Sequence, residues 1–175
     1  MKKNIVLTGF MGTGKTAAGR ELSRLLYMKL VDIDTLIEQS EQMTIPRIFE
    51  TLGEPAFRKI ETAVIHRVAK GDNIIISTGG GAVLRQENMD ALRETGVIIC
   101  LKATPDTILI RTGRTNNRPL LQVENPLQRI RELLEYRMPF YEKADIIITT
   151  DDKTPLQVAE YIIEKLKGEY GNRTG

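Results

Sequence analysis

The segment from Gly9 to Thr16 carries the residue types that bind a nucleotide phosphate. It reads GFMGTGKT, the spacing of a Walker A loop, and lies between an apolar run at 5–7 and a helix-like stretch from Ala17. Glycines let the backbone curl so that successive N–H groups point at phosphate oxygens, and the start of the next helix adds partial positive charge. Lys15 can reach the β- and γ-phosphates, and the Thr16 hydroxyl can bind Mg²⁺. The strand-like run before the loop and the helix-like stretch after it disfavour the alternative, which is a glycine-rich turn that matches the motif by chance.

Two acids, Asp32 and Asp34, flank Ile33 at the end of a short apolar segment. Side chains alternate along a strand, which would place both carboxylates on the same side of an extended segment. Beside a Mg²⁺-nucleotide, one could hold the metal through water and the other could take a proton from an acceptor hydroxyl. Alternatively, Asp34 caps the helix that begins at Thr35, and Asp32 is ordinary polarity at a strand end. The phosphate loop upstream favours the catalytic interpretation.

Three consecutive glycines, Gly79 to Gly81, follow another apolar run. Such a triplet loses much chain entropy on folding, which makes sense where the backbone passes close to a ligand. The alternative is a flexible turn, which usually needs only one glycine. Because the run before them does not end in the acid of a Walker B site, metal binding falls to Thr16 and Asp32.

Arginines occur in three places where an anion could be handled. Arg58 lies three residues before Glu61, so it either forms an ordinary surface pair or presents its guanidinium to a carboxylate ligand. The basic segment 111–121 is either a solvated loop or a lid that brings positive charge to the γ-phosphate and excludes water. Arg137 lies near a helix end, where pairing with the helix dipole is the simpler explanation.

The elements that must position these residues alternate between strands and helices. Apolar runs predict four strands buried on both faces, at 4–7, 73–76, 97–101 and 145–148, and a shorter fifth strand at 30–33. This alternation indicates an α/β fold with a parallel sheet. Segment 34–70 is helical almost throughout, 112–126 reads as a mobile loop, and the tail from 168 is expected to fray. Ligands bind at the carboxyl ends of such strands, so we expect the loop, the acid pair, the glycines and the arginines to meet there.

Composition narrows the class of protein. The 175 residues suit one domain, and a net charge of +2 gives no general nucleic-acid surface. No apolar run approaches the ~20 residues that span a bilayer, and the N-terminus shows no export signal, so a cytoplasmic protein is expected. Cys100, the only cysteine, lies in an apolar run, and His66, the only histidine, has no evident partner. Disulfides, thiolate metal sites and catalytic triads are therefore disfavoured.

Taken together, five motifs resemble the shikimate kinase family over essentially the whole chain. They are the phosphate loop, the DxD pair, a GExxFRxxE segment at 53–61, the GGG turn and an RPLL segment at 118–121. The phosphate loop alone is generic, whereas the FR segment with GGG and RPLL is far more specific. The resemblance implies a P-loop kinase fold of the nucleoside monophosphate kinase type, with a five-stranded parallel sheet flanked by helices. It also implies a single kinase domain over 1–175, with a substrate-binding helical region at 34–70 and a lid at 112–126.

The resemblance further implies ATP-dependent phosphorylation of the 3-hydroxyl of shikimate, a step in aromatic amino acid biosynthesis through chorismate. Lys15, Asp34 and Arg118 would be catalytic, and Thr16 and Asp32 would hold Mg²⁺. The residues implied to bind ATP are Gly12, Thr13, Gly14, Lys15, Thr16, Ala17, Arg111, which would stack on adenine, and Arg118. The residues implied to bind shikimate are Asp34, Phe49, Phe57, Gly79, Gly80 and Gly81, with Arg58 and Arg137 on its carboxylate.

Two other functions stay open at this point. One is another small-molecule kinase of the same fold, such as a gluconate or nucleoside monophosphate kinase, although the arginine pair and the triple glycine argue against it. The other is a non-enzymatic nucleotide switch, but the chain lacks the NKxD segment of guanine-specific switches. The expected partners are shikimate and ATP, with no nucleic acid and no membrane, and the expected working form is a monomer.

Overall fold

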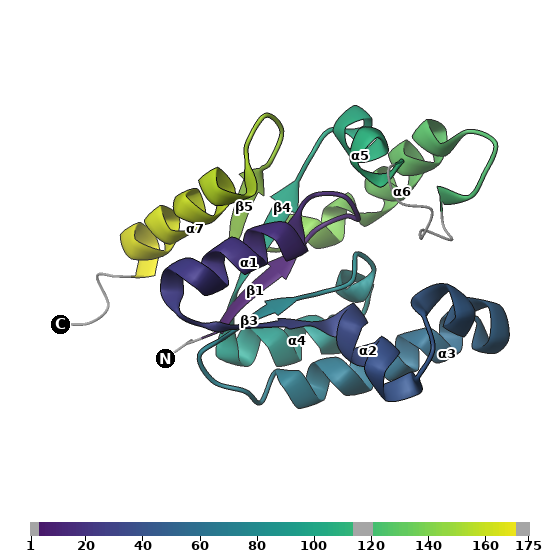
Figure 1. The fold of residues 1–175 in the computed structure, drawn as a ribbon, viewed down its shortest axis with the longest axis horizontal. Coiled ribbons are helices and arrows are strands. Elements are labelled where there is room, and N and C mark those ends of the chain that lie inside the picture. Colours follow the sequence, from purple (N-terminus) through teal and green to yellow (C-terminus); the bar gives the residue numbers. More distant parts are fainter. Residues whose placement is uncertain (1–3, 114–120, 171–175) are drawn as a thin grey trace.

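A five-stranded parallel sheet organises the molecule, with helices on both of its faces (Figure 1). The computed structural model describes residues 4–113 and 121–170, and its strand order is β2-β3-β1-β4-β5. The strands are β1 (Asn4–Thr8), β2 (Lys29–Asp32), β3 (Ile74–Ser77), β4 (Gly96–Lys102) and β5 (Ile146–Thr149). All neighbouring strands are parallel. The loop that follows β1 therefore lies in the middle of the sheet's carboxyl edge.

Helices connect the strands and cover the sheet. They are α1 (Lys15–Leu26), α2 (Ile33–Glu41), α3 (Ile45–Val68), α4 (Gln86–Thr95), α5 (Pro105–Thr112), α6 (Pro126–Tyr141) and α7 (Pro155–Tyr170), with a short 3₁₀ turn, η1 (Ala82–Leu84). Helix α1 packs beside α7, whereas α3 packs against α2 and α4. Helices α5 and α6 lie together near the end of β4 (Figure 1).

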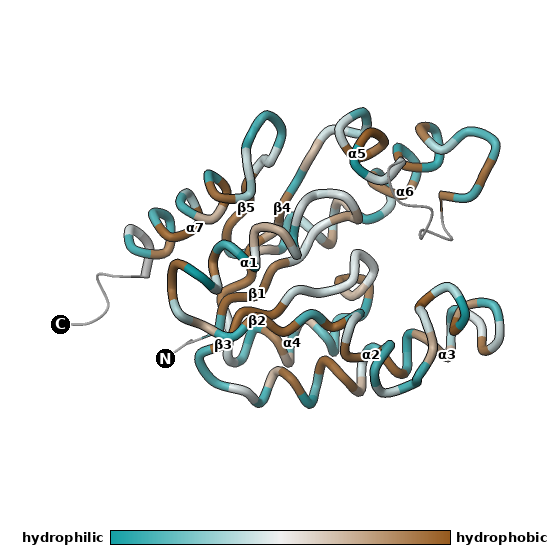
Figure 2. Tube along the Cα trace, in the orientation of Figure 1, coloured by the Kyte–Doolittle hydropathy of each residue, from teal (hydrophilic) through white to brown (hydrophobic). Residues whose placement is uncertain are grey.

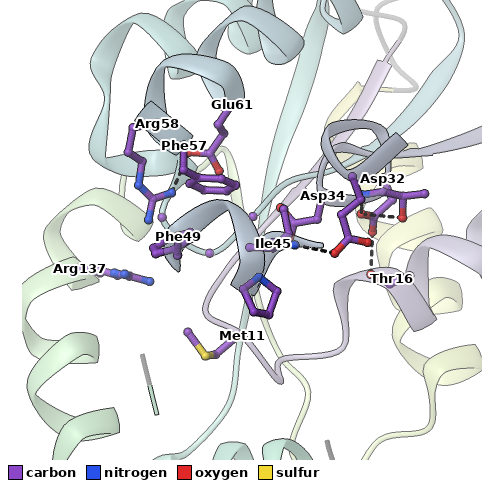
Figure 3. A pocket seen from close by; sticks show the side chains of 16 residues that line it. Met11, Thr16, Asp32, Asp34, Ile45, Phe49, Phe57, Arg58, Glu61 and Arg137 are labelled. Atoms are coloured by element: carbon purple, nitrogen blue, oxygen red, sulfur yellow. Dashed lines mark hydrogen bonds and ion pairs between the residues drawn. The ribbon is translucent and has the colours of Figure 1, made fainter. Parts of the chain in front are cut away.

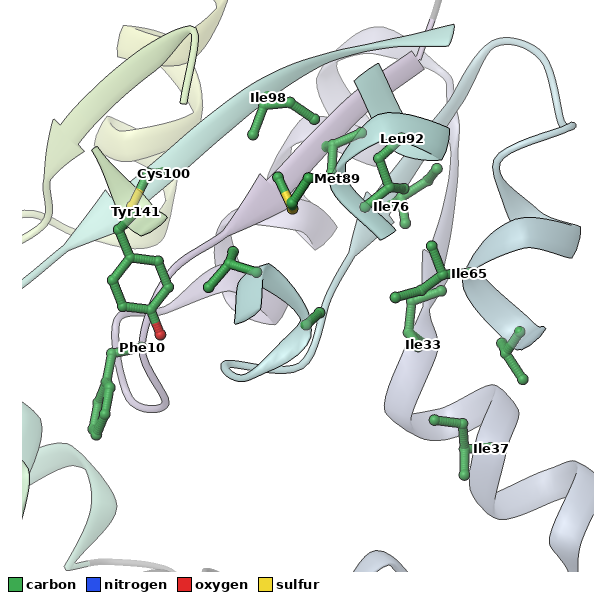
Figure 4. Packing of buried hydrophobic residues seen from close by; sticks show 14 of the residues in the cluster. Phe10, Ile33, Ile37, Ile65, Ile76, Met89, Leu92, Ile98, Cys100 and Tyr141 are labelled. Carbon is green, nitrogen blue, oxygen red and sulfur yellow. The ribbon is translucent and has the colours of Figure 1, made fainter. Parts of the chain in front are cut away.

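Alternating side chains of the central strands build two apolar cores, one on each face of the sheet. In β1, Val6 belongs to one core, and Ile5 and Leu7 belong to the other. This period of two is expected for a strand that is buried on both faces. Figure 2 shows these strands as the most hydrophobic segments of the chain. The core under α3 and α4 also contains Phe10 and Tyr141, which reach toward the carboxyl edge of the sheet (Figure 4).

The fold confirms the α/β prediction and all five strands, and it corrects several boundaries. The prediction that 145–148 is buried on both faces is wrong, because one face of β5 is open and Ile147 is 43% exposed. Strand β2 ends at Asp32, and Ile33 begins α2, so the two acids do not lie along one extended segment. The region 34–70 is helical as predicted, but Gly53 breaks α3 with φ 81° and ψ 164°, and Pro55 follows in the second half of the helix. The predicted fraying from 168 is not seen at its start, because α7 continues to Tyr170.

Within residues 4–113 and 121–170, no helix combines the length and the apolar composition needed to cross a bilayer.

Cys100 provides a test of the packing of the central strands. The thiol is fully buried in β4, and burial raises its pKa to about 11. At pH 8 only about a thousandth of this thiol would be ionised, and the thiolate is the reactive form. We expect the native protein to resist a disulfide reagent that labels one thiol per chain after denaturation. Stoichiometric labelling of the native protein at the rate of a free cysteine would contradict this packing.

Candidate active site

The phosphate loop between β1 and α1 is curled around the ammonium group of Lys15. Gly9, Gly12 and Gly14 have φ values of 132°, 77° and 93°, a region that disfavours side chains. Lys15 Nζ donates to the carbonyl oxygens of Gly9 and Phe10 at 2.8 and 2.9 Å. A cavity of about 250 Å³ adjoins the loop. Its curled backbone, helix N-terminus and lysine fit a bound polyphosphate.

Thr16 and Asp32 join α1 to the end of β2. The Thr16 hydroxyl donates to Asp32 Oδ2 at 2.9 Å, and the backbone N–H of Thr35 donates to Asp32 Oδ1 at 3.1 Å. Asp32, and not Asp34, is therefore the residue that caps α2. A hydroxyl and a carboxylate held together beside a phosphate loop offer the oxygen ligands that suit Mg²⁺.

Asp34 lies in the first turn of α2 and faces the glycine turn after β3. A Cβ atom on Gly79 would lie 3.0 Å from Asp34 Oδ1 and 2.8 Å from Glu61 Oε1. A Cβ atom on Gly81 would lie only 2.7 Å from the guanidinium carbon of Arg58. The sequence predicts that the backbone of the glycine triplet passes close to a ligand. In the structure this backbone lies close to charged side chains that line the cavity.

Arg58 and Glu61 form a pair at the base of the site. Arg58 donates to Glu61 Oε2 at 2.8 Å and also contacts Glu54 at 3.0 Å. Glu61 is fully buried, and burial raises its pKa, an effect that Arg58 opposes. Burial by itself would lower the pKa of Arg58, but the two glutamates outweigh it and raise the pKa. Arg58 does not form the ordinary surface pair that was one alternative, because Glu61 is buried, and it also lines the cavity.

Helix α6 brings Arg137 and Tyr141 to the same turn from the opposite side. Arg137 is only 3% exposed, its guanidinium lies 5.5 Å from the centre of the Phe10 ring, and its Nε has no hydrogen-bond partner among the described residues. Tyr141, one helical turn later, donates its hydroxyl to the Gly80 carbonyl at 2.6 Å. A buried guanidinium with unused hydrogen-bonding capacity is suited to an anionic ligand.

These groups surround one polarised cavity of about 370 Å³ (Figure 3). The guanidinium groups of Arg58 and Arg137 lie on one side, and the carboxylates of Asp32 and Asp34 lie on the other (Figure 3). The walls include the aromatic pair Phe49 and Phe57, whose ring centres are 4.8 Å apart. The cavity shares Met11, Thr16, Asp32, Asp34, Gly79 and Gly80 with the phosphate-loop cavity, so a donor and an acceptor would meet at these residues.

Arg111 belongs to the phosphate-loop side of the site. It donates to the Gly12 carbonyl at 3.4 Å and to the hydroxyl and carbonyl of Thr150 at 2.9 Å each. Thr150 in turn donates to the Thr13 carbonyl at 3.0 Å. The predicted residues Thr13, Gly14 and Ala17 also lie in or beside this loop. Arg118 lies outside the described residues.

Sequence reasoning missed two residues that support the site. Tyr141 could have been noticed, because it lies four residues after Arg137 and therefore on the same face of a helix. Thr150 lies in the segment 149–154, which follows the last strand and is therefore expected near the site, but its bonds to Arg111 and Thr13, 39 and 137 residues away, could not be read from the sequence. The burial of Glu61 also could not be read from its spacing to Arg58.

The fold and the site together define a phosphate-loop kinase of the nucleoside monophosphate kinase type. The sheet order, the curled loop and an adjoining polar cavity for an acceptor are its features.

Comparisons with known proteins identify the family. The family model described as Shikimate kinase matches residues 11–167. The shikimate kinase of Thermodesulfovibrio yellowstonii is 52% identical over 163 residues, which cover 93% of this chain and 94% of that protein. The one from Caldanaerobacter subterraneus subsp. tengcongensis is 50% identical over 169 residues, covering 95% and 99%. The solved structure of shikimate kinase from Acinetobacter baumannii in complex with shikimate is 39% identical, with a TM-score of 0.93 and coverage of 100% and 97%. The chain belongs to the shikimate kinase family.

The two glutamates that hold Arg58 differ in burial, which allows a matched test. Glu61→Ala should lower the free energy of unfolding by about 3 kcal/mol, because it leaves a mostly buried guanidinium short of its buried partner. Glu54→Ala should cost about 1 kcal/mol or less, because the Glu54 side chain is 47% exposed. Urea unfolding of both variants measures the difference. Equal losses of unfolding free energy in the two variants would show that the buried Arg58–Glu61 pair stabilises the fold no more than the exposed Arg58–Glu54 pair does.

Proposed function

We propose that this chain transfers the γ-phosphoryl group of ATP to the 3-hydroxyl of shikimate and forms shikimate 3-phosphate for aromatic amino acid biosynthesis. Family membership supports this activity. The observation that carries it is the shared wall of the two cavities, where Thr16, Asp32 and Asp34 border both the phosphate loop and the arginine-lined pocket. This wall is where a donor phosphate and an acceptor hydroxyl would meet.

The phosphate loop is the proposed ATP site. Backbone N–H groups of the loop and the start of α1 would hold the phosphates, and Lys15 would exchange its contacts with Gly9 and Phe10 for phosphate oxygens. Thr16 and Asp32 would hold Mg²⁺, which when bound offsets the charge of the phosphates. Arg111, already held between the loop and Thr150, is the proposed contact for the base.

The arginine side of the cavity is the proposed site for the shikimate carboxylate. Arg58 and Arg137 approach it from α3 and α6, and charge-assisted hydrogen bonds to a carboxylate are the strong class. Phe49 and Phe57 would pack against the ring. The turn from Gly79 to Gly81 would let the ring lie against backbone, because side chains there would meet Asp34, Glu61 or Arg58.

Asp34 is the proposed catalytic carboxylate. With the acceptor carboxylate on the arginines, a ring hydroxyl would reach the opposite, acidic side of the cavity beside the phosphate loop. Asp34 would orient this hydroxyl and accept its proton as the oxygen bonds to phosphorus, and Lys15 would stabilise the charge on the transferring group. We further propose that 112–126 acts as a lid that brings Arg118 to this group. We also propose a monomeric working form, in which one chain supplies every proposed site residue.

Phosphoryl transfer is tested by ADP release from MgATP with and without shikimate. We expect shikimate to stimulate release strongly, gluconate and nucleoside monophosphates to leave it near background, and omission of Mg²⁺ to abolish it. Release that shikimate does not stimulate would refute the proposed function. Stimulation by gluconate alone would assign the chain to another kinase activity on the same fold.

Asp34→Asn should reduce kcat by about 10²- to 10⁴-fold, because the amide cannot accept the hydroxyl proton. Nucleotide affinity and unfolding temperature should stay close to those of the unmodified protein. Glu38→Gln is the matched control, because Glu38 also lines the cavity but its carboxylate accepts a hydrogen bond from the N–H of Ile45. Normal kcat in Asp34→Asn would show that Asp34 has no part in proton transfer.

Tyr141→Phe should raise the KM for shikimate roughly fivefold to tenfold, because it removes the hydroxyl that holds the Gly80 carbonyl. The KM for ATP and the kcat should change less than about twofold. Tyr136→Phe provides the control, because Tyr136 lies on the same helix and is 64% exposed. A parallel rise of both KM values in the Tyr141 variant would indicate a general loss of structure instead.

A further inference from the structure

A separate cavity of about 630 Å³ lies along the edge strand of the sheet. Strand β2 pairs only with β3, so its other edge is not covered by another strand of the sheet. The cavity extends from this edge to α1, to α2, which follows β2 directly, and to the C-terminal end of α3. It meets the phosphate side of the site only at Thr16 and Asp32, and none of the shikimate-side arginines lines it.

The floor of this cavity is aliphatic. Leu30 extends from the core under α1, whereas Leu36, Val68 and Ile74 extend from the core under α3. All four side chains are partly buried, so both cores reach the surface at this edge of the sheet. A ligand seated here would cover apolar surface that the fold leaves in contact with water.

The rim of the cavity is cationic. Arg20 comes from α1, Lys29 from β2 and Arg67 from α3, and all three side chains are exposed. Within residues 4–113 and 121–170, none of the three makes an ion pair, a side-chain hydrogen bond or a contact with an aromatic ring. The one acid that lines the cavity, Asp32, is already bonded to Thr16 and to the N–H of Thr35.

Two exposed arginines on the same helices, Arg24 and Arg47, do have acidic partners. Arg24 pairs with Glu21 on the same helix as Arg20, and Arg47 pairs with Glu50 on the same helix as Arg67. Arg20, Lys29 and Arg67 thus lie around an apolar hollow, in three separate elements, without a carboxylate partner among the described residues.

We propose that this cavity binds a small organic anion that has an apolar body and a carboxylate, phosphate or sulfonate group. The apolar body would cover the aliphatic floor, and the anionic group would bind the guanidinium groups of Arg20 and Arg67 with Lys29 nearby. The volume lies in the range of ordinary small-molecule sites. The cavity shares only Thr16, Asp32 and Thr35 with the proposed shikimate cavity, and neither Arg58 nor Arg137 lines it. Because Thr16 and Asp32 also line this cavity, the bound anion would lie next to the two residues that are proposed to hold Mg²⁺.

The probe for this site is 8-anilinonaphthalene-1-sulfonate, an apolar ring system with one anionic group. Its fluorescence is titrated against the full chain with saturating shikimate and MgADP present, so that the other cavities are occupied. We expect one bound probe per chain. In Arg20→Gln/Arg67→Gln the dissociation constant should rise about tenfold or more, because two charge-assisted contacts are lost.

Two controls separate this site from general adhesion to apolar surface. Arg24→Gln/Arg47→Gln removes the same charge from the same helices away from the cavity and should change the dissociation constant less than about twofold. N-phenyl-1-naphthylamine, the same ring system without the sulfonate, should not distinguish the two double variants. Absence of probe binding, equal weakening by both double variants, or equal weakening of the neutral probe would each overturn the proposal. None of these fluorescence readouts depends on catalysis, so failure of this proposal can be told from failure of the proposed kinase activity.

Discussion

The contact between the Gly79–Gly81 turn and the charged side chains around it is the constraint on which the site depends. Gly79 lies against the carboxylates of Asp34 and Glu61, and Gly81 lies against the guanidinium of Arg58. Gly80 lies between the backbone of the phosphate loop and Arg137, with its carbonyl held by Tyr141. One backbone segment without side chains therefore sets the positions of α2, α3, α6 and the phosphate loop relative to one another.

The charged side chains around this turn divide the cavity into a side with two guanidinium groups and a side with the carboxylates of Asp32 and Asp34 (Figure 3). Glu61 is buried beside Arg58 and compensates part of its charge, which keeps the guanidinium in place before any ligand arrives. Arg137 adds a second guanidinium from another helix, so an anionic ligand would be held from two directions. The carboxylate of Asp34 lies across the cavity from the two guanidinium groups, next to the phosphate loop (Figure 3). This arrangement would fix the orientation of a bound acid, because reversing it would bring carboxylates together.

Much of this architecture could be predicted from the sequence, and the failures have physical causes. The strands and the phosphate loop were predictable because apolar runs and glycine spacing are local signals. The geometry of the acid pair was predicted wrongly: Asp32 caps α2, which places Ile33 and Asp34 in the helix, whereas alternation along a strand had been assumed. The burial of Glu61, the bond from Tyr141 to Gly80 and the bridge from Arg111 to Thr150 depend on tertiary contacts, which spacing along one chain does not show.

The central claim is that the paired arginines recognise the carboxylate of the acceptor. The most direct test is calorimetric binding of shikimate and of its methyl ester to the unmodified protein and to Arg137→Met. The account predicts that the unmodified protein prefers the acid over the ester by about tenfold to a hundredfold, and that Arg137→Met reduces this preference about tenfold while ester binding changes little. An unchanged preference for the acid in Arg137→Met would contradict the assignment of this arginine and of the cationic end of the site.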